Sequence, residues 1–248
     1  MPTPVTEAVP ETGKHHARPR REIIRRHSWA VRLTHWINAI TIFIMVGSGL
    51  NIFNAHPRLY WGQAGADFDK PFLALHRWPG WLTIPSYRDL ADARHWHFFF
   101  AWILVVNGAL YLAWSLASRH IQRDIWPTVG DLRAIPRSII DHVKLRHPKG
   151  EAAKRYNVLQ RLAYVGLVML VVGMVLTGLS MSPGFDAFAP WLVDVLGGRQ
   201  SARTLHFLFA AAIVLFIAVH LIEVVLAGAI NEVRSMITGR YAVPGEHD

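Results

Sequence analysis

The chain has 248 residues, of which 52% are hydrophobic and 17% are charged, and it contains no cysteine. This composition is typical of a membrane protein, and the missing cysteines exclude disulfides, cysteine-ligated iron–sulfur clusters and covalently attached c-type haem. The net charge of +9 lies in segments that flank apolar runs, which argues against a nucleic-acid-binding protein.

The N-terminal residues 1–26 are polar and basic, which predicts a disordered tail. The apolar run that follows is too long for a signal peptide and has no small-residue cleavage site. We therefore predict an uncleaved first span over about residues 33–53, with His35 at its start. Gly47 and Gly49 have no bulky side chains, so another helix or a flat cofactor could approach this span closely.

A long segment, residues 54–94, follows the first span and is rich in tryptophan, which favours the headgroup level of a membrane. We expect an ordered interfacial cap here. The second predicted span covers about residues 95–118 and opens with His95 and His97. Asn107 lies in the middle of this span and needs a polar partner.

The second half of the chain contains two more apolar spans. Residues 119–157 are basic, and the stretch DLRAIPRSIIDHVKL within them predicts an amphipathic helix on the membrane surface. The third span covers about residues 158–181, and the fourth covers about 204–230. The predicted fold class is an all-α integral membrane protein with a four-transmembrane-helix bundle spanning residues 27–240, followed by a short tail over 241–248.

The distribution of lysine and arginine predicts the orientation of the bundle. Nineteen of these residues lie on the side that carries both termini, and seven lie on the opposite side. The positive-inside rule therefore places both termini in the cytoplasm, as expected for a multi-pass protein of the bacterial inner membrane.

Two histidines in the fourth span indicate cofactor binding. His206 and His220 are separated by fourteen positions, which returns to within about 40° of the same helix face, roughly 21 Å further along. Ionisable groups at membrane depth are costly and usually functional. For either residue alone, a hydrogen-bonded histidine between helices is the more ordinary interpretation, and the matching histidines in other spans reverse this preference.

Histidines in the other spans match this pair in depth. His35 should lie at the level of His220 on the cytoplasmic side, and either His95 or His97 should lie at the level of His206 on the outer side. Spacing alone does not choose between His95 and His97. Because six-coordinate haem takes one imidazole from each of two helices, we predict two haems b, each held by one interhelical histidine pair through its iron.

Four motifs then resemble one family, the dihaem cytochrome b (gamma) subunits of membrane formate dehydrogenases. They are THW in the first span, HFFFA in the second, KRYNVLQR before the third and H-x13-H in the fourth. Related subunits serve nickel–iron hydrogenases and thiosulfate reductase-type molybdoenzymes. The resemblance implies that the ligand in the second span is His97, and that a quinone binds near His220 beside Asn157 and Gln160. The long 54–94 segment departs from the family pattern.

The residues of this expected quinone site have suitable chemistry. Amide groups such as those of Asn157 and Gln160 donate hydrogen bonds to quinone carbonyls. Quinone reduction also takes up protons, and Glu223, three residues after His220, could relay them. The alternatives are that Asn157 caps the third helix and that Glu223 extends to the membrane interface.

Together these features predict an electron-transfer subunit that connects a periplasmic redox enzyme with the quinone pool. We expect the 54–94 segment to dock that partner, although it could instead only cover the outer haem. One alternative function is a stand-alone haem oxidoreductase that acts on a small oxidant such as superoxide. Another is a haem-free membrane anchor or transporter.

Overall fold

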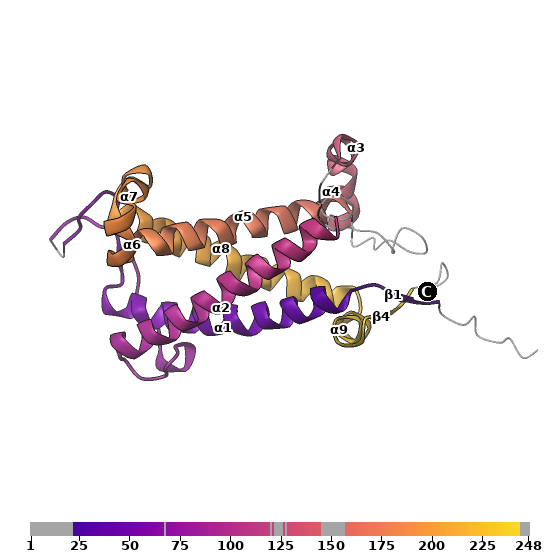
Figure 1. Ribbon diagram of the computed structural model, residues 1–248, viewed down its shortest axis with the longest axis horizontal. Coiled ribbons are helices and arrows are strands. Elements are labelled where there is room, and N and C mark those ends of the chain that lie inside the picture. Colours follow the sequence, from indigo (N-terminus) through magenta and orange to yellow (C-terminus); the bar gives the residue numbers. More distant parts are fainter. Residues whose placement is uncertain are drawn as a thin grey trace, which may run out of the picture.

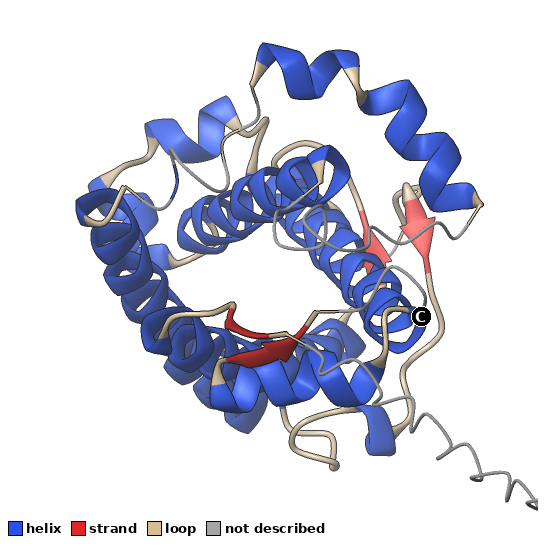
Figure 2. Ribbon diagram, turned by 90° about the vertical axis from the view of Figure 1, so that its right-hand side faces the viewer, coloured by secondary structure: helices blue, strands red, loops and turns tan. Residues whose placement is uncertain are grey.

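A computed structural model describes residues 22–66, 68–119, 121, 126, 128–144 and 157–243. Four long helices run along the long axis of the molecule (Figure 1) and surround a common axis in the end view (Figure 2). They are α1 (Trp29–Ala55), α2 (Leu90–Ala117), α5 (Val158–Ser180) and α8 (Arg199–Leu226). Each is long and apolar enough to cross a membrane, so the predicted four-span bundle is confirmed.

Three of the four spans begin at a side chain that caps the helix. Ser28, Asp89 and Asn157 each accept a hydrogen bond from the backbone N–H three residues later, at the start of α1, α2 and α5 respectively. These caps satisfy backbone donors that have no partner within the helix. The cap at Asp89 explains why α2 starts before the apolar run, at Leu90 rather than at residue 95.

Hydrogen bonds tie α1 and α2 together within the bundle. The Asn107 amide donates to the backbone carbonyl of Thr34 at 3.0 Å and to the Asn38 Oδ1 atom at 2.7 Å. The expectation that Asn107 has a polar partner is therefore confirmed. Thr34 immediately precedes His35, so this contact also supports the position of that histidine.

The bundle buries small residues and exposes large apolar ones. Thr41, Ser48, Thr177 and Thr204 are almost completely buried. Large side chains along the spans face outward instead, including Phe43, Phe99, Trp102, Met169 and Leu215. Small residues allow membrane helices to approach closely, whereas outward apolar side chains suit a lipid environment.

The 54–94 segment is folded onto the ends of α1 and α8. It contains two short strands, β2 (Arg58–Leu59) and β3 (Leu73–Ala74), which pair with each other, and the 3-10 helix η1 (Gly80–Leu82). The Thr204 hydroxyl donates to the Tyr60 carbonyl at 2.7 Å, and the side chains of Leu59 and Tyr60 are buried. The predicted ordered cap is therefore present at this end, which we call the loop end of the bundle.

Two glycines shape the connection that leads into α8. The short helices α6 (Pro183–Phe188) and α7 (Trp191–Val195) also lie at the loop end (Figure 1). After them, Gly197 and Gly198 have positive φ angles of 79° and 105°. A Cβ atom on Gly198 would lie 2.5 Å from the backbone carbon of Gly62, so the cap and α8 can meet only if this residue is glycine.

The opposite end of the bundle, which we call the terminal end, carries short surface elements. These are α3 (Val129–Arg133), α4 (Ile135–Val143), α9 (Ala229–Thr238) and the antiparallel strands β1 (Ile23–Arg25) and β4 (Arg240–Ala242), all of which lie toward the right-hand end of the molecule in Figure 1. The stretch predicted as one surface helix forms two helices, α3 and α4. Residues 1–21 and 244–248 lie outside the described residues, so most of the predicted tails is not placed.

The structure differs from the sequence prediction at the end of the fourth span. We expected this span to continue to Ile230 and to be followed by a polar tail. Instead α8 ends at Leu226, the chain turns at Gly228, whose φ is 103°, and α9 begins at Ala229. The strand β1 also falls inside the predicted disordered tail, because its backbone pairs with β4 from the other end of the chain.

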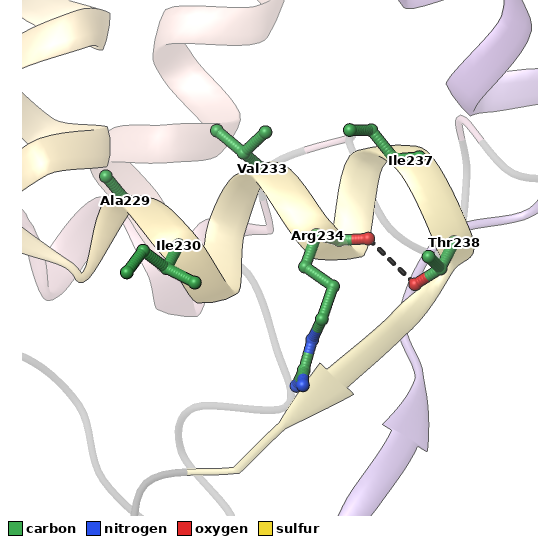
Figure 3. Close-up of a pocket in the computed structure, with 6 residues that line it drawn as sticks. All are labelled: Ala229, Ile230, Val233, Arg234, Ile237 and Thr238. Carbon is green, nitrogen blue, oxygen red and sulfur yellow. Dashed lines mark hydrogen bonds between the residues drawn. The ribbon is translucent and has the colours of Figure 1, made fainter.

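A shallow surface groove on α9 is lined by apolar side chains. Figure 3 shows Ala229, Ile230, Val233 and Ile237 along the helix, together with the Thr238 hydroxyl donating to the Arg234 carbonyl. Ile230 and Ile237 are well exposed, whereas Ser235 faces inward and is buried. An amphipathic helix with an open apolar face beside the ends of membrane spans suits the lipid interface. The groove contains none of the histidines discussed below.

Candidate functional site

At the loop end of the bundle, two histidines from different helices face each other. His97 lies in the second turn of α2, and His206 lies in the second turn of α8. Their ring centroids are 6.2 Å apart, and the ring planes make an angle of 63°. His95 is exposed, so of the two histidines that open the second span the structure brings only His97 to His206.

A second pair lies at the terminal end. His35 in the second turn of α1 faces His220 near the end of α8, with ring centroids 6.4 Å apart and planes at 63°. The ring of Phe216 is nearly parallel to that of His220, with an interplanar angle of 2°. Because α8 contributes to both pairs, the two pairs lie one above the other along the bundle.

The spacing within each pair fits one metal ion between two imidazoles. An imidazole nitrogen lies about 2.0–2.1 Å from a bound transition metal, and the ring centre lies about 1.1 Å further away. Two imidazoles on opposite sides of one ion should therefore have centroids roughly 6.2 Å apart. The observed separations of 6.2 Å and 6.4 Å agree with this value. Histidines that face each other from two different helices of a bundle are also a suitable donor set for the iron of haem b.

Hydroxyl groups contact both histidines at the loop end. The Ser48 Oγ atom of α1 lies 3.1 Å from Nδ1 of His97, and the Thr177 Oγ1 atom of α5 lies 3.0 Å from Nδ1 of His206. In each imidazole the contact occupies Nδ1 and leaves Nε2 for a metal. Hydrogen bonds of this kind orient metal-binding histidines in proteins. The sequence analysis did not identify Ser48 or Thr177.

The surroundings of His35 are different. Its Nδ1 atom is buried and has no hydrogen-bond partner within the part of the chain that the structure describes. Its ring instead meets the Trp36 ring edge-on, with centroids 5.3 Å apart. The two histidine pairs therefore share their spacing but differ in what holds the imidazoles.

The amide side chains expected near a quinone form a reciprocal cap at the start of α5. The Asn157 Oδ1 atom accepts from the Gln160 backbone N–H at 2.8 Å, and the Gln160 Oε1 atom accepts from the Asn157 backbone N–H at 3.1 Å. Asn157 therefore caps the third span, which is the alternative role that the sequence analysis gave for this residue. The cap uses the amide oxygens, whereas a quinone carbonyl requires the amide N–H groups.

A cluster of charged and phenolic residues at the terminal end was not expected from the sequence. Arg26 pairs with Glu232 of α9 at 3.3 Å, and its guanidinium lies 4.3 Å from the centre of the buried Tyr241 ring. Glu232 also interacts electrostatically with His220. Glu223, the carboxylate that the sequence analysis singled out, is partly buried on α8. No local pattern could have indicated Glu232, because it belongs to a helix that was predicted as tail.

Comparisons with known proteins identify the family to which the chain belongs. A family model described as prokaryotic cytochrome b561 matches residues 26–239. The chain is 32% identical over 206 residues to a protein of Azospira oryzae named as a protein-methionine-sulfoxide reductase subunit, YedZ1, with 83% of this chain and 93% of the relative covered.

More distant relatives are named as Ni/Fe-hydrogenase B-type cytochrome subunits. One from Cupriavidus necator is 25% identical, with 84% of this chain and 83% of the relative covered. One from Bradyrhizobium diazoefficiens is 22% identical, with 84% of this chain and 82% of the relative covered. The resemblance to membrane cytochrome b subunits is confirmed, and the chain belongs to the prokaryotic cytochrome b561 family.

Proposed function

We propose that this protein is the membrane subunit of a redox complex, in which two haems b carry electrons between the quinone pool and a partner enzyme. The observation that supports this most directly is the pair of facing histidine sites along α8, each with the centroid spacing expected for one metal between two imidazoles. Haem b supplies reversible one-electron chemistry when it is bound.

The protein's own residues would hold and insulate the two cofactors. His97 and His206 would hold the iron of one haem at the loop end, and His35 and His220 would hold the iron of the other at the terminal end. The outward faces of the surrounding spans are apolar, and small buried residues let α1 pack closely on α2 and α5 on α8. Burial and the type of ligand at each site would set the potential of a bound haem.

The loop end is the proposed docking surface for a partner enzyme on the periplasmic side. Exposed aromatic side chains gather in the cap and the short helices beside it: Trp61, Phe72, Trp81, Phe188 and Trp191. Aromatic residues are enriched in protein interfaces. The relatives are named as subunits of a methionine sulfoxide reductase and of hydrogenases, so the partner class we propose is a redox enzyme. With a reductase as partner, electrons would run from quinol to the loop end.

The cap has a second possible role, which is only to cover the haem of the loop end. Shortening the 54–94 segment without changing its net charge separates these roles. We expect both haem spectra to be retained and electron transfer from the native partner to be lost. Full electron transfer after shortening would contradict docking through this surface.

Quinone exchange is proposed at the terminal end, on the cytoplasmic side. The amide N–H groups of Asn157 and Gln160 are the proposed donors to a quinone carbonyl, with Glu223 as a proton relay. Each hydrogen bond to the quinone contributes roughly 0.5–1.5 kcal/mol in net terms, so Asn157→Ala or Gln160→Ala should weaken binding of a quinone-site inhibitor several-fold. If the residues serve only as the helix cap, both changes should lower stability by about 1 kcal/mol and leave inhibitor binding unchanged.

The decisive experiment is a haem count on the purified protein. We expect a pyridine haemochrome assay to give two haems b per chain. Replacing a histidine at one end should remove one haem and leave the other. A haem-free protein would favour the anchor or transporter, whereas rapid haem oxidation by superoxide without any partner would favour the stand-alone oxidoreductase.

A further inference from the structure

Two short segments of the chain occur twice, once in each half of the bundle. The segment MVGSGL (residues 45–50) in α1 matches MVLTGL (174–179) in α5. The segment HFFFA (97–101) in α2 matches HFLFA (206–210) in α8. In both halves the first segment supplies a hydroxyl and the second supplies a histidine, and the two helices of each half pack against each other.

The hydroxyl groups have the same hydrogen-bond geometry in the two halves. Ser48 Oγ donates its single hydrogen to the Ile44 carbonyl at 2.8 Å, and Thr177 Oγ1 donates to the Gly173 carbonyl at 2.7 Å. Since each hydroxyl hydrogen is already used within its own helix, the oxygen can only accept from the facing imidazole. The Nδ1 atom of each histidine must therefore carry the proton, which leaves the lone pair of Nε2 available to a metal.

A glycine follows the hydroxyl in each half and lets the imidazole lie against the helix. A Cβ atom on Gly49 would lie 3.5 Å from Cε1 of His97, and one on Gly178 would lie 3.4 Å from Cε1 of His206. The position of each ring is thus fixed by the hydrogen bond at Nδ1 and by the helix backbone that lies beside Cε1. Both imidazoles are constrained in the same manner, which random substitution would not produce twice.

The repeat does not extend to the terminal end. When Ser48 is aligned with Thr177, Tyr164 takes the place of His35. When His97 is aligned with His206, Tyr111 takes the place of His220. Each copy of the repeat therefore has one histidine and one tyrosine at this level, and the Nδ1 atom of His35 has no partner among the described residues. The matched hydroxyl contacts belong to the loop-end pair.

We propose that Ser48 and Thr177 are a matched pair of positioning residues for the haem of the loop end. By accepting from Nδ1–H they fix the tautomer and ring orientation of both ligands and increase the electron donation of each imidazole. Stronger donation stabilises the oxidised iron, so the two contacts keep the midpoint potential of this haem low. This inference rests on the proposed haem ligation.

Redox titration of purified variants, followed optically and by electron paramagnetic resonance, tests this role. Ser48→Ala and Thr177→Val should each shift the midpoint potential of one haem to more positive values. The affected haem should be the one that His206→Ala removes, and the double variant should show a larger shift than either single variant. The low-spin signal of the same haem should change, because its ligand planes are no longer held.

Three control variants separate hydrogen bonding from packing. Ser48→Thr and Thr177→Ser keep the hydroxyl and should keep the wild-type potential. Ser115→Ala removes a buried hydroxyl near the other end of α2 and should change neither haem. If Ser48→Ala loses the haem, Ser48→Cys provides the same test, because a thiol fills the site but accepts hydrogen bonds only weakly.

Two results would overturn the inference. One is a wild-type potential and an unchanged low-spin signal in Ser48→Ala and Thr177→Val, or in Ser48→Cys where it replaces the alanine variant. The other is an equal shift in Ser48→Thr, which would indicate packing. A wild-type protein that binds no haem would instead contradict the proposed function, so the two failures are distinguishable.

Discussion

The contact between Asn107 and the first span offers the sharpest test of how the bundle supports its histidines. The Asn107 amide makes two interhelical hydrogen bonds, to the Thr34 carbonyl and to the Asn38 side chain, at 3.0 Å and 2.7 Å. Asn107→Leu removes both bonds with little change in side-chain volume. It also leaves the Asn38 oxygen without this donor, one turn of helix after His35.

The expected cost follows from these two bonds. Interhelical hydrogen bonds in membrane proteins contribute about 0.6 kcal/mol on average and up to about 1.7 kcal/mol. Two of them give a loss of about 1 to 3 kcal/mol in the free energy of unfolding. Because Thr34 adjoins His35, we also expect the haem of the terminal end to dissociate before the other haem as the variant unfolds.

Equilibrium unfolding in mixed micelles, followed by the haem absorption band, measures this cost. Ser115→Ala is a matched control on the same helix, because Ser115 is buried but its hydroxyl has no hydrogen-bond partner in the described part of the chain. Loss of the Ser115 hydroxyl should therefore change the free energy of unfolding very little. A double-mutant cycle with Asn38→Leu then isolates the bond between the two asparagines. The reasoning is refuted if Asn107→Leu destabilises the protein no more than Ser115→Ala does.

Three further predictions concern other parts of the chain. His97→Ala should reduce the haem content by one per chain while His95→Ala leaves it unchanged, as measured by pyridine haemochrome; the reverse result would reassign the ligand. Gly198→Ala should lower thermal stability, because its Cβ atom would overlap the backbone of the cap; a melting temperature equal to that of the wild type would contradict this. Hydrogen bonds from the backbone and hydroxyl of Thr128 hold the pKa of Asp131 below its usual value, so their stabilisation of α3 is present above about pH 4 and is lost as the pH falls through the lowered pKa. Hydrogen exchange in α3 of the wild type should therefore accelerate at low pH. In Asp131→Asn the exchange should already be fast at neutral pH. A wild-type exchange rate that does not depend on pH, after correction for intrinsic exchange, would refute this role of Asp131.

The sequence by itself determined the number and approximate limits of the membrane spans. Each span is a local property, because about twenty apolar residues form a helix in lipid whatever surrounds them. The spacing of His206 and His220 was equally local, since one helix carries both residues. The family resemblance also depended on short motifs that lie within or just before single spans.

Only the tertiary structure decided which side chains meet across the bundle. Spacing left His95 and His97 open, and the packing of α2 turns His97 toward His206 and leaves His95 exposed. The hydroxyl partners Ser48 and Thr177 lie 49 and 29 residues from the histidines that they contact, so no local pattern connects them.

The terminal end shows the same division. Composition predicted polar tails there, but β1 and β4 are stable as strands only because they pair with each other from opposite ends of the chain. The turn at Gly228 separates α9 from α8, although the apolar residues run on without a break to Ile230. Hydrophobicity measures affinity for lipid and carries no information about chain direction, so a backbone turn within an apolar run became visible only in the folded structure.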